Sequence, residues 1–551
     1  MMERLAYLWP EIAVFATTCI VMVLGLSRSL AVRKATALVS GLGLLVALYL
    51  AITTTPGRVG AGLVDPAHGQ SFLPTMVPFA KCLICIVALI LLPLLAGTVD
   101  RAEEARIASG RGVFNPLRSN RAEFYSFFLF SVTGLLLVAS ADDLIWLFLA
   151  LELTSLPTYV MVAISSSRHR AQEAGVKYFF LGALGAAMFL YGFALLYGAT
   201  GTTNLNKIYD IFTASGISTL GMLGLLITLF GLFFKIAAVP MHFYTADVYQ
   251  GAAPGVSAML AFIPKTAGFL AILLIVGTVG WRFGPDGSGT SLPEPIRITL
   301  WVVAALTMTI GNTLAVMQSS TKRMLAYSSI AHSGYMLVGV IAGPGDASFS
   351  KSGIAAVLFY LLAYGVMNVG CFAALAAIER KPKAGEDEAR EIDHVDDLRG
   401  ICRSHPVAGW TMVICALSLL GLPPLLGFFG KLPLFTSAVS AGEIPLVIVL
   451  GLNSAIAAFY YLRLMALPLL EEAHPRAEAT EDAPFAARRI AGVVSAGGVV
   501  LLAVLAGQLM TQSEIAGRYM PQYKPAAAVE SSQPSLMDAL QAVPGVTGGR
   551  Q

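Results

Sequence analysis

Long apolar runs recur along the whole chain, and they constrain its fold more than any other feature. Each is at least 19 residues long, and a helix needs roughly 20 apolar residues to cross a bilayer. Membrane strands are about half that length and alternate polar with apolar residues, so the runs predict a helical bundle whose backbone polar groups are satisfied internally. Fourteen spans are expected, at 9–27, 35–54, 75–97, 123–141, 143–164, 174–199, 216–240, 253–280, 296–317, 324–343, 351–378, 406–438, 444–467 and 488–510.

Composition supports a membrane protein. Of the 551 residues, 56% are hydrophobic and only 13% are charged, against roughly 25% charged in soluble domains. A soluble enzyme and a disordered protein are therefore excluded. A net charge of +3 gives no basic excess for nucleic acid, so the expected surroundings are a lipid bilayer.

The distribution of Lys and Arg predicts the orientation. Loops after odd-numbered spans carry 21 of these residues, and loops after even-numbered spans together with both tails carry nine. By the positive-inside rule, both termini lie outside and the loops 98–122 and 379–405 are cytoplasmic. The second loop is charge-dense and is expected to be solvated. The tail after Gly517, rich in Pro, Ala and Gly, is expected to be poorly ordered.

Six basic residues remain within or close to the spans. An ionisable group at mid-span costs at least ~2.5–3.5 kcal/mol, so each needs a reason. Lys81, Lys177 and Arg463 lie near helix ends and are expected to extend to the membrane surface. Lys265 lies deep in its span beside Pro264, which is expected to kink the helix and admit water near the amine.

Lys235 and Lys431 each follow a Phe-containing segment and stand beside proline: Phe233-Phe234-Lys235 precedes Pro240, and Phe428-Phe429-Gly430-Lys431 precedes Pro433. Broken helices in matching places of two halves are typical of transporter sites. Because the two spans are five apart, the pattern favours an inverted repeat. The two lysines are therefore candidates for equivalent positions.

Glu152 is the only carboxylate that lies so deep in an apolar run, and a lysine on a neighbouring helix is its expected partner. His332 is also mid-span; it is either a hydrogen-bonded packing residue or a proton relay close to the lysines. For His242 and Asp247, a helix-end role and a proton-entry role are evenly balanced. Asp143 reads as a helix-start cap.

Motifs for cofactors are missing from the sequence. Cys82 and Cys85 form a lone C-x-x-C pair inside an apolar run, which favours packing over a metal or iron–sulfur site. No phosphate-binding loop and no H-E-x-x-H motif occur. We therefore expect no metal, nucleotide, haem or flavin in this chain.

Several stretches resemble one family closely, and together they cover about residues 120–465. They are Asp143 to Tyr159, Lys177 to Gly201, Lys235 to Pro254, Met324 to Tyr335, Phe359 to Asn368, Gly421 to Lys431, and Asn453 with Tyr460 to Arg463. The family is that of the N subunits of proton-pumping NADH:quinone oxidoreductase (respiratory complex I), which belong to the antiporter-like membrane subunits. Lys431 is informative, because the similar M subunits carry a glutamate there.

The resemblance implies an all-α polytopic membrane protein of 14 helices with two inverted five-helix repeats and broken helices seven and twelve. It divides the chain into a three-helix segment with a cytoplasmic loop (1–122), a first repeat (123–280), a second repeat (281–470), and a last helix with a disordered tail (471–551). It also assigns proton-transfer roles, listed in chain order: Glu152, Lys235, Lys265, His332 and Lys431.

The implied function is proton translocation driven by quinone reduction elsewhere in a bacterial inner-membrane complex. NADH, flavin, iron–sulfur clusters and quinone are then expected in partner subunits, and the partners are neighbouring antiporter-like and small K-type membrane subunits. Two rivals stay open at this point. A subunit of a multi-subunit cation/proton antiporter shares the fold, and a purely structural subunit is disfavoured by the buried lysines.

Overall fold

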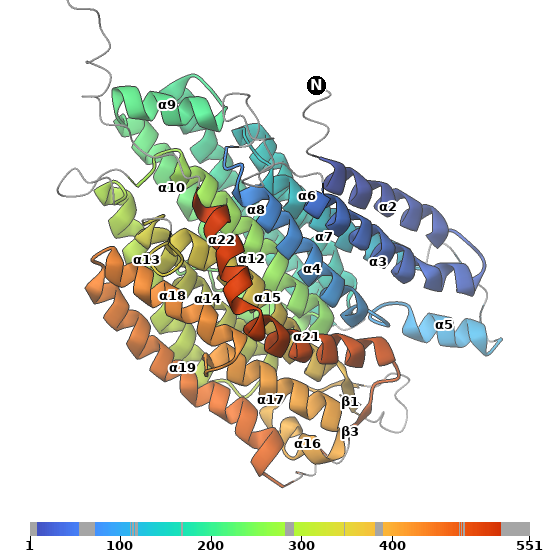
Figure 1. Cartoon of the computed structure of the whole chain (residues 1–551). Helices are drawn as coiled ribbons and strands as arrows, with labels where there is room; N and C mark the ends of the chain where they lie inside the picture. Colours follow the sequence, from blue (N-terminus) through green and yellow to red (C-terminus); the bar gives the residue numbers. More distant parts are fainter. Residues whose placement is uncertain are drawn as a thin grey trace, which may run out of the picture.

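The computed structural model describes residues 8–53, 72–281, 291–380 and 390–518, with short gaps at 111, 113–114, 116–118, 167–168, 346–347, 473, 475–476 and 478–479. Within these ranges the helices pack side by side into an elongated bundle (Figure 1). Eleven described helices are long and apolar enough to cross a membrane, and three shorter apolar helices bring the total to the predicted fourteen. The prediction of a polytopic helical protein is confirmed.

The described residues of the first half of the chain form eleven helices. They are α2 (Trp9–Gly25), α3 (Leu30–Thr53), α4 (Met76–Leu94), α5 (Arg101–Ala108), α6 (Arg121–Ala139), α7 (Leu144–Ile164), α8 (His169–Thr200), α9 (Leu205–Ser215), α10 (Thr219–Lys235), α11 (Thr245–Gly251) and α12 (Pro254–Gly277).

In the second half, the part that the structure describes adds further helices and three short strands. The helices are α13 (Glu294–Val316), α14 (Thr321–Ala342), α15 (Gly353–Ala376), η2 (Val395–Leu398), α16 (Ile401–Ser404), α17 (Pro406–Leu420), α18 (Leu426–Ser440), α19 (Ile444–Leu470), α21 (Ala486–Val504) and α22 (Ala506–Arg518). The strands are β1 (Ile378–Arg380), β2 (Arg390–Glu391) and β3 (Thr480–Asp482).

Two helices form the centre of the bundle. Every residue of α12 and of α15 is buried, which is expected of helices that are apolar all round. Figure 1 shows α2 and α3 at one edge of the bundle and α19 at the opposite edge, with α12 and α15 between them. In the most apolar stretch of the edge helix α3, only a third of the residues are buried. The remaining apolar surface of this helix is therefore available to lipid or to partner subunits.

Two spans are broken near their middle, as predicted for the seventh and twelfth. The first span is interrupted between α10 and α11, and the second is interrupted between α17 and α18. Helices from elsewhere in the bundle satisfy the backbone freed at the first break: the hydroxyl of Ser333 donates to the carbonyl of Ile236 at 2.5 Å, and the amide of Val239 donates to the hydroxyl of Thr307 at 2.9 Å. Irregular backbone is tolerated at this depth because protein groups replace the missing hydrogen bonds.

The predicted solvated loop 379–405 is largely folded in its described part. Strand β1 lies between β2 and β3 in one antiparallel sheet. The carboxylate of Glu379 is buried between Arg488 and Arg101, at 3.1 and 2.7 Å. The expectation failed because paired charges need not stay in water. Residues 381–389 lie outside the described residues, as does the predicted poorly ordered tail after Gly517 except for Arg518, which ends α22.

The side chain of Lys81 does not extend to the membrane surface, so that prediction was wrong. Its ammonium is fully buried and lies 2.7 Å from the carboxylate of Glu11, which is 3% exposed. The hydroxyl of Ser140 donates to the same carboxylate oxygen at 3.0 Å. A carboxylate from α2 therefore makes burial of the lysine tolerable, because a buried charge is stable only when it is paired and hydrogen-bonded.

We predict that Lys81→Met destabilises the protein by about 3–5 kcal/mol, because it leaves an uncompensated buried carboxylate. The double variant Glu11→Gln/Lys81→Met should recover most of this loss, since it removes both charges. Thermal inactivation of the purified complex measures the effect. A double variant no more stable than Lys81→Met would contradict the ion-pair interpretation.

Candidate functional site

Glu152 and Lys235 form the ion pair expected from the sequence. Glu152 lies on α7, and Lys235 is the last residue of α10, where the helix breaks. The Lys235 ammonium lies 3.2 Å from the Glu152 carboxylate, and it donates to the hydroxyl of Ser155 at 2.5 Å. The lysine side chain is 2% exposed and that of the glutamate 19%, so the pair joins the interior of the bundle to its surface.

Lys265 lies on the central helix α12, which continues through Pro264. Its ammonium donates to the carbonyl of Ser329 and, at 2.6 Å, to the hydroxyl of the same residue on α14. The ring of Tyr364 lies 5.3 Å away, within cation–π range. None of the ion pairs found among the described residues involves this lysine, so neutral dipoles and an aromatic face alone hold its charge.

A small cavity, here called the inner cavity, lies between Lys235 and Lys265. Its volume is about 10 Å³, roughly the room of one water molecule. Its lining consists of Tyr178, Lys235, Ala237, Tyr244, Thr245, Tyr249, Leu260, Pro264 and Lys265. The phenols and the threonine offer a water molecule there the polar partners that it needs.

His332 lies one turn along α14 from Ser329, the partner of Lys265. Its two ring nitrogens lie 2.6 Å from the hydroxyls of Tyr360 and Tyr461, respectively. The Tyr461 hydroxyl also contacts the hydroxyl of Ser328. A neutral imidazole has one donor and one acceptor nitrogen, so the ring can take a proton from one tyrosine side and release one toward the other.

Lys431 does not occupy the position that corresponds to Lys235. Lys235 ends the helix before its break, whereas Lys431 lies after the other break, within α18. The Lys431 ammonium nevertheless returns to that break, since it donates to the carbonyl of Leu420 at 2.9 Å. Gly421, with a φ of 90°, permits this approach: a Cβ there would lie 3.0 Å from the lysine side chain. The local pattern of Phe and Pro residues predicted that both lysines lie close to a helix break. It did not predict whether each lysine precedes or follows the break.

Tyr360 connects the histidine to the last lysine. Its hydroxyl bonds His332, and its ring packs against Gly430, the residue before Lys431. The five predicted residues therefore follow one another through the interior in the order Glu152, Lys235, Lys265, His332 and Lys431. The hydroxyls between them were missed: Ser155, Ser329, Tyr360 and Tyr461. The sequence did offer a signal for them, because these hydroxyl groups lie deep within apolar runs.

The remaining charges near the spans are peripheral. Asp247 on α11 pairs with Arg323 at 2.5 Å and with Lys177 at 3.4 Å, and Lys177 is 44% exposed, as expected for a helix-end lysine. Asp143 caps α7 through the amide of Ile145 at 2.8 Å. His242 lies in the non-helical stretch after Lys235, and its role stays a prediction.

Fold and site together define a multi-pass helical membrane protein with a row of ionisable side chains in its interior. Such groups are costly in a bilayer and mark ion or proton pathways in transporters and pumps. Residues 141–457 match the family described as NADH:quinone oxidoreductase/Mrp antiporter, transmembrane.

Relatives and solved structures agree with this family. NADH-quinone oxidoreductase subunit N 1 of Rhizobium meliloti is 36% identical over 490 residues, which cover 88% of this chain and 92% of that protein. A chain of respiratory complex I from Thermus thermophilus is 31% identical, with a TM-score of 0.68 and coverage of 91% and 98%. A chain of the Mrp complex from Dietzia, 22% identical with a TM-score of 0.70 and coverage of 95% and 99%, shares the fold. The chain belongs to the NADH-quinone oxidoreductase subunit N family.

Proposed function

We propose that this chain is the proton-translocating membrane-arm subunit N of an NADH:quinone oxidoreductase. One observation carries the proposal: the ionisable groups from Glu152 to Lys431 lie in succession in the interior, with hydroxyls and a water-sized cavity among them. A structural subunit would have no need to bear the cost of three lysines and a histidine in the membrane.

The residues of the row differ in electrostatics, and this difference supports proton transfer. Lys235 has a carboxylate 3.2 Å away, which stabilises its ammonium form. Lys265 is held by uncharged groups, and desolvation disfavours its ammonium form. If Glu152 moves away, Lys235 loses its counter-charge and transfer of its proton toward Lys265 becomes more favourable.

The chain acts as a non-redox subunit in this proposal. Quinone reduction, with NADH, flavin and iron–sulfur clusters in partner subunits, would supply the free energy. The neighbours are other antiporter-like subunits and a small K-type subunit. The location is the bacterial inner membrane.

A cation/proton antiporter subunit remains the second candidate, because the matching family description includes Mrp antiporters. The two are separated in sealed vesicles. Proton uptake that requires NADH and quinone supports the oxidoreductase, whereas sodium-driven proton exchange without an electron donor supports the antiporter.

We predict that Lys265→Met reduces quinone reductase turnover and proton uptake together, about tenfold or more, because a side chain that cannot titrate blocks the row. Lys265→Arg should also be impaired, since a guanidinium does not release its proton. Complex content on native gels should be normal, because loss of an unpaired buried amine removes a desolvation cost. Lys207→Met, which replaces an exposed lysine, is the matched control. Normal turnover of Lys265→Met at normal complex content would show that the proton route does not pass through Lys265.

For Glu152→Gln we expect an assembled complex whose turnover falls about tenfold or more. The amide keeps the shape of the side chain but removes the charge that compensates Lys235. Turnover and the ratio of protons moved to electrons transferred are measured in vesicles. A variant with the parent's turnover and ratio would show that the pair has no part in pumping.

The positive-inside rule further predicts that the C-terminus faces outward. A C-terminal fusion to a reporter enzyme that is active only outside the cytoplasm should therefore be active. A fusion to a protein that fluoresces only in the cytoplasm should be dark. The opposite pair of results would reverse the proposed orientation.

A further inference from the structure

The segment 391–398, here called the anchor segment, lies at the end of the bundle that the positive-inside rule assigns to the cytoplasm. Its apolar side chains Ile392, Val395 and Leu398 are fully buried. The amide of Val395 donates to the carbonyl of Ser319, just before α14, at 3.0 Å. Because burial of three large apolar side chains is strongly stabilising, the anchor segment is a fixed part of the bundle, and any group that it holds has a fixed position.

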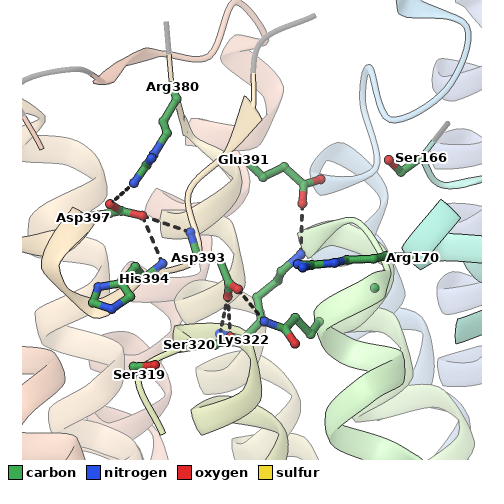
Figure 2. A pocket seen from close by; sticks show the side chains of 12 residues that line it. Ser166, Arg170, Ser319, Ser320, Lys322, Arg380, Glu391, Asp393, His394 and Asp397 are labelled. Atoms are coloured by element: carbon green, nitrogen blue, oxygen red, sulfur yellow. Dashed lines mark hydrogen bonds and ion pairs between the residues drawn. The ribbon is translucent and has the colours of Figure 1, made fainter. Parts of the chain in front are cut away.

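The polar side chains of the anchor segment line a cavity with a volume of about 340 Å³ (Figure 2). Water beside these side chains weakens the attraction between their charges, so their hydrogen bonds matter here mainly for the geometry that they impose. The lining includes Glu391, Asp393, His394 and Asp397 from the anchor segment, Gln250 from α11 and Lys322 from α14.

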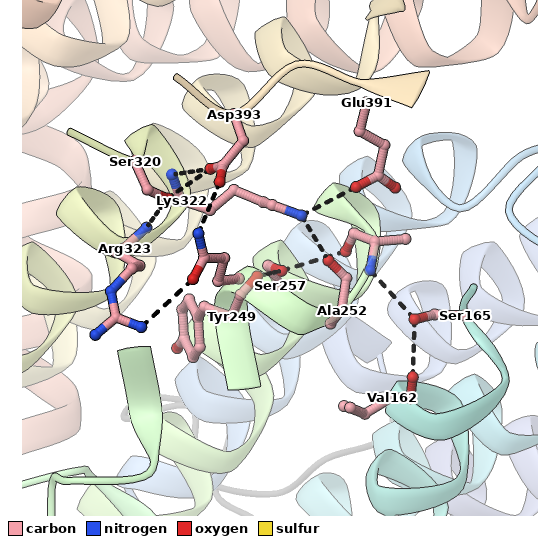
Figure 3. Close-up of polar contacts among 12 residues, drawn as sticks. Val162, Ser165, Tyr249, Ala252, Ser257, Ser320, Lys322, Arg323, Glu391 and Asp393 are labelled. Atoms are coloured by element: carbon pink, nitrogen blue, oxygen red, sulfur yellow. Dashed lines mark hydrogen bonds and ion pairs between the residues drawn. The ribbon is translucent and has the colours of Figure 1, made fainter. Parts of the chain in front are cut away.

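Asp393 of the anchor segment contacts both α14 and α11. One of its carboxylate oxygens accepts from the hydroxyl of Ser320 at 2.6 Å and from the amide of Lys322 at 3.3 Å. The other oxygen accepts from the side-chain amide of Gln250, on α11, at 2.9 Å. Figure 3 shows Asp393 at the start of α14, beside Ser320 and Lys322. A carboxylate is favoured at a helix N-terminus, so α14 holds Asp393 and Asp393 in turn holds Gln250.

The side-chain amide of Gln250 is held at both of its polar atoms. Its nitrogen donates to Asp393, and its oxygen accepts from the guanidinium of Arg323, on α14, at 3.4 Å. The same guanidinium lies 2.5 Å from the carboxylate of Asp247, one turn earlier on α11. A flipped amide would set its NH2 group against the guanidinium and its oxygen against a carboxylate. Only one orientation is therefore satisfied, and it fixes the last turn of α11.

Tyr249, the residue before Gln250, lines the inner cavity together with Lys235 and Lys265. Its side chain is buried. Helix α11 has only seven residues, too few for its internal hydrogen bonds to keep it in place, so contacts from outside decide where Tyr249 lies. Helix α14 also holds the ammonium of Lys265. It therefore places both the lysine and, through Asp393, the tyrosine beside it.

We propose that Asp393 and Gln250 are positioning residues for proton transfer between Lys235 and Lys265. Their hydrogen bond keeps Tyr249 against the inner cavity, which then has the width of one water molecule. In the transfer, an N–H bond of the Lys235 ammonium breaks and an N–H bond forms at the neutral amine of Lys265, while the water between them releases one proton as it accepts the other. A displacement of about 1 Å can slow such a step roughly 10²-fold. The inference rests on the proposed function and adds two residues that lie outside the row.

The test exchanges donor and acceptor in this hydrogen bond. Asp393→Asn leaves one acceptor oxygen where two are used, and Gln250→Glu sets two carboxylates against each other. The double variant Gln250→Glu/Asp393→Asn restores the bond with its direction reversed, and the new carboxylate can still accept from Arg323. We expect each single variant to lower quinone reductase turnover per assembled complex several-fold, and the double variant to recover most of the loss. Gln172→Glu and Asp210→Asn, at exposed positions, are the matched controls.

A solvent isotope effect separates positioning from mere stability. Turnover is measured in H2O and in D2O and divided by the complex content on native gels. If the single variants slow proton transfer, that step limits turnover, so the isotope effect increases above the parent's and returns to it in the double variant. A parental isotope effect in both single variants, at any complex content, or a double variant no better than either single variant, would overturn the proposal. A parent complex that reduces quinone without moving protons would instead overturn the proposed function.

Discussion

Polar groups that lie within the membrane must find their partners inside the protein, and the architecture follows from this requirement. The backbone exposed at the first break receives hydrogen bonds from Ser333 and Thr307, on two other helices. The break is stable only while α13 and α14 stay packed against it. Since Lys235 ends the helix at this break, the position of an ionisable group is fixed by contacts from the other half of the chain.

The same requirement separates structural charges from those proposed to move protons. Lys81 and Glu11 are both almost fully buried and lie 2.7 Å apart, an arrangement in which either charge is costly to change. Glu152 instead keeps 19% of its side chain exposed at the edge of the bundle. Its charge can therefore respond to a neighbouring subunit. Lys265 and Lys431 have uncharged partners, so their protonation does not break an ion pair.

Hydropathy was sufficient for the fourteen spans because the bilayer imposes a length and an apolar composition on each helix. Depth within a span identified Glu152, Lys265 and His332 for the same reason. Pairings between distant helices were harder to predict. Lys81 lies near a helix end, and only the packing of α2 against α6 brings Glu11 within reach of it. In the sequence, Tyr360 and Tyr461 cannot be distinguished from aromatic residues that only pack in the core. Their polar role is evident only from the structure, where the ring of His332 lies between their hydroxyls.

The different partners of the three lysines give the row a direction. Glu152 compensates only Lys235, whereas the partners of Lys265 and Lys431 are uncharged. With the pair intact, the ammonium form is stabilised at Lys235, at the Glu152 end of the row. In the proposed route, opening of the pair would make transfer of that proton toward Lys265 more favourable.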